Sequence, residues 1–81
     1  MERAVLTVEP VPHGWVVRLK GRALEFRNTK IEAIGVASDR AARRHQVSGD
    51  PTSVSVRMGT GESVLIARYG WEGQRSRNSL R

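Results

Sequence analysis

The stretch NTKIEAIGVASDRAARRH, residues 28–45, decides the fold of this 81-residue chain. It opens with Thr29-Lys30-Ile31-Glu32, which fits a capping box: the threonine oxygen accepts from an early helical amide, and the glutamate reaches back to the cap. Small and branched apolar residues then recur at helical spacing and share one broad face: Ile31, Ala33, Ile34, Ala37, Ala41 and Ala42. The pattern predicts a helix over residues 30–44 whose alanine face can lie close against a sheet.

The polar side of this helix ends in a cluster of bases. Arg40 and Arg43 point away from the alanine face, together with Glu32, Val36 and Asp39. Arg43, Arg44 and His45 fall in the last turn, where positive charge offsets the partial negative charge of the exposed carbonyls. The cluster therefore either stabilises the helix end or binds an anion, and the sequence leaves both interpretations open.

Segments with strand-like patterns flank the helix. Alternation of side chains and β-branched content predict strands over residues 3–8, 15–20, 23–27, 52–58 and 63–69. Gly21-Arg22 predicts a two-residue hairpin turn that opens with glycine, residues 46–51 break the helix, and residues 59–62 form a second turn. The order β-β-β-α-β-β predicts an α+β fold, an antiparallel sheet with one helix packed on one face. The order of the strands across the sheet stays open.

Length and composition limit the kind of protein. Residues 1–70 are expected to form a single small domain, and the polar residues 71–81 a flexible basic tail. The chain has no cysteine, which excludes disulfides and thiolate zinc sites. No apolar run of roughly 18 residues is present, so no membrane partner is expected. We predict a soluble, cytoplasmic protein.

Three segments together carry a resemblance: GWVVR at 14–18, NTKIEAIGVASDRAA at 28–42 and ARYG at 67–70. The chain resembles a family of short bacterial proteins of unknown function, which share a G-W-x-V hairpin strand, a T-x-x-E-A-I alanine-rich helix and a closing Y-G strand. Such families carry a D-G turn between the last two strands, whereas this chain has Gly59-Thr60-Gly61. The resemblance implies a compact sheet-and-helix domain and brings no activity with it.

No catalytic constellation is evident in the sequence. A nucleophile requires a base within hydrogen-bonding reach. The two histidines fit structural roles better, His13 as a solvated residue of a Pro-Gly turn and His45 as a helix terminator or edge-packing residue. No His, Asp or Glu residues show metal-ligand spacing, and Gly59-Thr60-Gly61 lacks the context of a dinucleotide fingerprint. We therefore expect no enzymatic activity, no cofactor, no metal and no small-molecule substrate.

The net charge of +6 favours a polyanionic partner, since arginine forks suit phosphate. The bases form two candidate surfaces, one on the sheet face away from the helix and one at the helix terminus. The leading hypothesis is binding to the phosphate backbone of DNA or RNA without sequence preference, through Arg18, Lys20, Arg40, Arg43, Arg44 and Arg57.

A homodimeric interaction or structural module is the alternative, with the charge serving solubility. It is motivated by VLIA at 64–67, a run that is apolar on both faces. An unpaired strand edge can also pair with a second chain.

Overall fold

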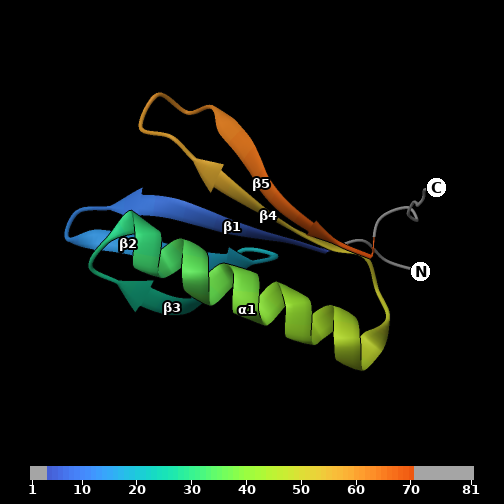
Figure 1. The fold of residues 1–81 in the computed structure, drawn as a ribbon. Helices are drawn as coiled ribbons and strands as arrows, with labels where there is room; N and C mark the ends of the chain where they lie inside the picture. Colours follow the sequence, from blue (N-terminus) through green and yellow to red (C-terminus); the bar gives the residue numbers. More distant parts are fainter. Residues whose placement is uncertain (1–3, 71–81) are drawn as a thin grey trace.

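The computed structural model describes residues 4–70, and its elements follow the predicted order (Figure 1). The tail predicted for residues 71–81, including Trp71, lies outside the described residues. The elements are β1 (Ala4–Val11), β2 (Gly14–Leu19), β3 (Arg22–Arg27), α1 (Lys30–Ser48), β4 (Thr52–Arg57) and β5 (Ser63–Tyr69). The fold is therefore α+β, with five strands and one helix that lies across one face of the sheet.

The sheet is mixed rather than purely antiparallel, so that part of the prediction was wrong. Its strand order is β3-β2-β1-β4-β5. Strand β1 runs antiparallel to β2 and parallel to β4, with Leu6 opposite Leu19 on one side and Val54 on the other. Because α1 carries the chain back over the sheet, β4 enters beside β1 in the same direction. The three consecutive pairs β1–β2, β2–β3 and β4–β5 are antiparallel hairpins, as their short links require.

The β2–β3 turn is one residue earlier than predicted. Its two central residues are Lys20 and Gly21, with φ of 54° and 83°. Positive φ at both central residues is the signature of a type I′ turn, which matches the twist of the flanking strands. The predicted glycine-first turn at Gly21-Arg22 was wrong because the glycine takes the second position.

Helix α1 begins as predicted and ends later. The Oγ1 of Thr29 accepts from the Glu32 amide at 3.2 Å, which confirms the cap. The helix continues through residues 46–48 and stops at Gly49, which takes a left-handed conformation with φ of 79° and donates its amide to the His45 carbonyl. Residues 46–48 therefore did not break the helix, since Gly49 supplies the C-terminal cap and Pro51 lies beyond it.

The core lies between α1 and the central strands. Ala33, Ala37 and Ala41 are fully buried against apolar residues of β1, β2 and β4: Leu6, Val8, Val17, Val54 and Val56. The small side chains let the helix backbone approach the sheet closely, as the sequence predicted.

Two residues at the margin of the helix differ from prediction. Ile31, expected on the buried face, is 81% exposed, because it lies in the first turn, ahead of the buried alanines. Val36, expected to point away, packs partly against the core. Trp15 also packs there, and the Lys30 ammonium lies 5.8 Å from the centroid of its ring.

Candidate nucleic-acid interface

The face of the sheet opposite α1 is called the open face here, because no other element within residues 4–70 packs against it (Figure 1). Successive side chains along a strand point to opposite faces of the sheet. The residues that precede and follow a helix-facing residue in the same strand therefore belong to the open face. The cross-strand registers place the following residues on it: Val5, Thr7, Glu9, Val16, Arg18, Phe26, Ser53, Ser55, Arg57, Leu65 and Arg68. Val16 and Ser53 are buried although they lie on this side of the sheet. The exposed and half-buried residues of the face are apolar, hydroxyl-bearing and cationic, with the one carboxylate of Glu9 among them.

A carboxylate lies between two of the predicted arginines on this face. Arg18 Nε is 3.3 Å from Glu9 Oε1, and Arg57 Nη1 is 3.8 Å from Glu9 Oε2. The Arg57 side chain remains 54% exposed and that of Arg18 36% exposed. One negative charge therefore serves two guanidinium groups, and the cluster retains a net positive charge.

The predicted residue Lys20 lies at the end of this surface, in the β2–β3 turn. Its neighbour Arg18 donates from Nη1 to the Gly21 carbonyl at 3.3 Å, which ties the open face to the turn. Lys20 is exposed. The turn therefore extends the positive surface beyond the strand ends.

The sequence-based prediction missed Arg68. Strand β5 pairs with β4 so that Arg68 lies opposite Ser53, on the open face. Leu65 lies opposite Ser55, also on the open face. The register shifts between Val54 and Ser55, so β5 has one more residue than β4 between these two pairs. Because β5 is apolar along nearly its whole length, its sequence does not show which of its residues face the helix. Strand β4 alternates clearly, and pairing β5 with β4 could have placed Arg68 on the open face.

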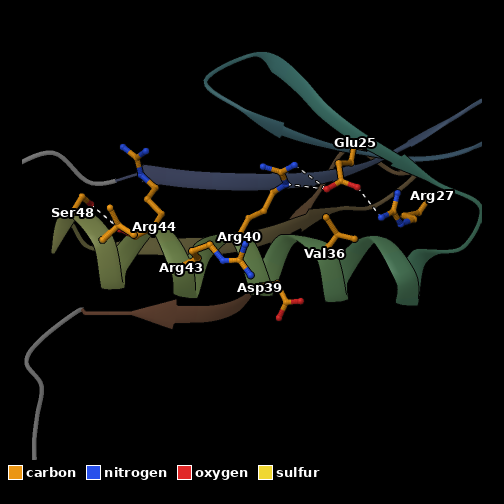
Figure 2. A pocket seen from close by; sticks show the side chains of 9 residues that line it. Glu25, Arg27, Val36, Asp39, Arg40, Arg43, Arg44 and Ser48 are labelled. Atoms are coloured by element: carbon orange, nitrogen blue, oxygen red, sulfur yellow. Dashed lines mark hydrogen bonds and ion pairs between the residues drawn. The ribbon is translucent and has the colours of Figure 1, made fainter.

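The remaining three predicted residues, Arg40, Arg43 and Arg44, lie on the opposite side of the sheet. They line a groove of about 570 Å³ between α1 and β3 (Figure 2). Arg40 donates from Nε and Nη2 to Glu25 Oε2 at 3.1 and 2.8 Å. The six predicted residues therefore form two surfaces, three on or beside the open face and three in the groove.

Acidic groups balance much of the charge in this groove. Glu25 also pairs with Arg27 at 2.7 Å, and Arg44 Nη2 lies 4.0 Å from Asp50 Oδ2. Asp39 lines the same groove beside Arg43 (Figure 2). The groove is thus more nearly neutral than its four arginines suggest.

The hydrogen bond from Arg40 holds the pKa of the Glu25 carboxyl below its ordinary value. The positive charge of Arg27 acts in the same direction, and desolvation opposes both. Folding lowers the pKa of this carboxyl, so its ionised form stabilises the folded state at pH values above the ordinary pKa of 4.5. This stabilisation is lost as the pH falls through the lower pKa of the folded state.

We expect a Glu25→Gln variant to lose less stability on acidification than the wild type. The variant lacks the carboxyl whose protonation breaks the contacts to Arg27 and Arg40. Urea midpoints measured from about pH 6 to about pH 3 should show the two proteins converging at acid pH. Parallel curves at all pH values would show that these ion pairs contribute no pH-dependent stability.

Comparison with protein-family models, with curated proteins and with solved structures gave no match. The resemblance to a bacterial family of unknown function therefore stays a prediction. Within residues 4–70, no helix is both long and apolar enough to cross a membrane. In the same part of the chain, no three His, Asp or Glu side chains gather where they could hold a metal ion.

Proposed function

We propose that this chain binds nucleic acid through the open face, by contacts to the phosphate backbone that do not depend on base sequence. The observation that carries the proposal is that Arg18, Lys20, Arg57 and Arg68 lie on or beside one sheet face that no other element of residues 4–70 covers. Within these residues the strand registers place one carboxylate on that face, Glu9, which is shared by Arg18 and Arg57. Guanidinium forks donate two parallel hydrogen bonds to phosphate oxygens. Such contacts supply most of the affinity in non-specific binding.

Other groups of the open face suit the same ligand. Thr7 and Ser55 are half-buried hydroxyls on the adjacent strands β1 and β4, and hydroxyls are common donors to phosphate oxygens. The existing ion pairs do not prevent binding, because exposed pairs contribute only about 0–1 kcal/mol. A phosphate can therefore replace Glu9 as a partner of Arg57.

The groove side is the weaker candidate for the same ligand. Its best-placed cation, Arg40, already makes two hydrogen bonds to Glu25. Asp39 and Asp50 add negative charge close to Arg43 and Arg44. A phosphate backbone would meet carboxylates at three points there, and like charges oppose such an approach.

Replacement of Glu9 by glutamine is expected to tighten binding. The change removes the one carboxylate that the strand registers of residues 4–70 place on the open face, and Arg18 and Arg57 lose their shared partner. Fluorescence anisotropy with a labelled single-stranded oligonucleotide at low salt should show about a fivefold lower Kd, on the order of 1 kcal/mol.

The matched control for this experiment is Asp39→Asn, which makes the same charge change on the exposed side of α1. It should alter the Kd by less than about twofold, because the added charge is screened across the sheet. Equal tightening by both variants would assign the effect to net charge alone. A Glu9→Gln protein that binds no better than wild type would contradict a role for the open face.

Self-association through β5 is the second candidate. This strand forms one edge of the sheet, and its Val64, Leu65 and Ile66 are 45–46% exposed. An apolar edge strand with unpaired backbone groups can add to a sheet of another copy. Sedimentation velocity across a wide protein concentration range tests this: a dimer disrupted by Leu65→Lys supports it, and a monomer at all concentrations contradicts it.

Neither proposed role involves catalysis, a cofactor or a metal. We also propose that the protein acts in the cytoplasm, where nucleic acid is available and a chain without cysteine loses nothing from the reducing conditions.

A further inference from the structure

A hollow of about 320 Å³ lies beside the β1–β2 turn, at one end of the open face. Its walls include Val11, Pro12, His13, Phe26 and Asn28. Val11 pairs with Gly14, and Phe26 pairs with Val16. Gly14 alternates in phase with Val16, so Gly14 and Phe26 belong to the open face. Trp15 and Arg27, which also line the hollow, belong to the helix side, and the hollow therefore lies at the ends of β2 and β3, where the two faces meet.

Gly14 also lines this hollow. Its φ of 154° lies in a region that side-chain-bearing residues rarely adopt, and a Cβ there would lie 2.5 Å from the Arg27 carbonyl oxygen. The position therefore requires glycine, which lets β2 and β3 approach closely.

We propose that this hollow takes one unpaired nucleobase, so that the partner of the open face is single-stranded nucleic acid; this inference rests on the function proposed above. Phe26 supplies the stacking surface: the residue is 63% exposed although it belongs to a strand. Stacking on an aromatic ring tolerates every base, because every base has a π-face. Asn28 and His13 offer polar groups at the rim for the edge of the base.

The cations of the open face lie at a suitable spacing from this hollow. Arg18 follows Val16 by two residues on the same face, which corresponds to roughly 7 Å along β2, and Val16 lies directly opposite Phe26. A nucleotide whose base enters the hollow would therefore place its phosphate within reach of the long Arg18 side chain. The remaining phosphates would continue across the sheet toward Arg57, on β4.

Duplex nucleic acid fits this arrangement less well. Its bases are paired and stacked, and moving one of them into the hollow requires flipping it out of the helix. A duplex can still contact the cations through its backbone. The inference therefore predicts preference for single strands, and not exclusive binding to them.

The test compares a single-stranded oligonucleotide and a duplex of the same mixed sequence by fluorescence anisotropy, at one salt concentration. The wild type should bind the single strand about tenfold more tightly. Phe26→Ala should weaken single-strand binding about tenfold and duplex binding by less than twofold, whereas Phe26→Tyr, which retains a stacking ring, should bind as the wild type does.

Two further measurements sharpen this comparison. Ile31→Ala serves as the control, since it also shortens a highly exposed apolar side chain but lies on α1, and it should leave both affinities unchanged. In a Trp71→Phe background Trp15 is the only tryptophan, and because it also lines the hollow, the single strand should quench its fluorescence.

The outcomes separate this inference from the proposed function. The base-binding role is overturned if Phe26→Ala binds the single strand as tightly as the wild type does. It is also overturned if the wild type binds duplex and single strand equally well. Either result leaves backbone binding intact. Absence of binding to either nucleic acid overturns both. Quenching of Trp15 by a polyproline peptide, without any response to the oligonucleotide, would assign the hollow to a peptide. That result overturns the base-binding role and leaves backbone binding at the open face to be judged by the anisotropy titrations.

Discussion

A Leu6→Ala variant is expected to lose about 2–5 kcal/mol of its free energy of unfolding, which is the usual cost of truncating a buried leucine. Leu6 is 1% exposed and lies in β1, the central strand, between Leu19 of β2 and Val54 of β4. Since a domain of this size is only marginally stable, the loss should bring the protein close to unfolding at room temperature. Urea denaturation followed by circular dichroism measures it.

The control for this variant is Val64→Ala on β5, which is 45% exposed at the edge of the sheet. It should cost less than about 1 kcal/mol, because a half-exposed side chain loses little buried area on truncation. Similar losses for both variants would contradict a core centred on β1. A Leu6→Ala protein as stable as the wild type would contradict it as well.

An Arg18→Gln/Arg57→Gln double variant is expected to bind nucleic acid on the order of a hundredfold more weakly than the wild type. Two charge-assisted contacts are removed, each worth about 1.5 kcal/mol, and each 1.4 kcal/mol is a factor of ten in affinity. Both side chains are at least one-third exposed, so the substitutions should leave the core intact. Anisotropy titrations at low salt measure the loss.

The matched control is Arg40→Gln/Arg43→Gln, which makes the same change in net charge in the groove between α1 and β3. It should weaken binding by no more than about threefold, through the long-range field alone. Should the groove variant lose as much affinity as the open-face variant, the binding surface would have to include the helix. Circular dichroism of both proteins checks that neither has unfolded.

Local features of the fold were predictable from the sequence because each depends on neighbouring residues. The Thr29 cap and the buried run of Ala33, Ala37 and Ala41 follow from spacing within a single helix. The bounds of β5 follow from a continuous apolar run between two glycine-containing segments. The end of the helix was missed because residues 46–48 have no strong preference, and the cap that stops the helix is Gly49.

The arrangement of strands depends on contacts between distant segments, and local patterns do not encode it. The parallel pairing of β1 with β4 joins residues separated by 48 positions, as in Leu6 opposite Val54. No turn chemistry fixes such a pairing. The predicted turns at residues 21–22 and 59–62 require antiparallel pairs. The prediction of a purely antiparallel sheet applied the same geometry to β1 and β4, between which the chain passes through the helix.

Part of the candidate interface followed from alternation alone. Arg18 and Arg57 were expected on one side of the sheet, and the register places both there. What the sequence did not provide was the distribution of acids: Glu9 reaches two arginines across three strands, and Glu25 meets Arg40 fifteen residues away. The ion pairs of Glu25 and Asp50 balance much of the charge in the groove.

The salt dependence of wild-type binding tests the central claim most directly. Three or four phosphate contacts to single-stranded DNA predict that log K falls linearly with log salt concentration, with a slope of about −2 to −3. Anisotropy titrations with a labelled, unstructured oligonucleotide, at salt concentrations from about 20 to about 200 mM, would show that slope. Failure to bind at the lowest salt, or an affinity that does not change with salt, would contradict a phosphate-binding open face.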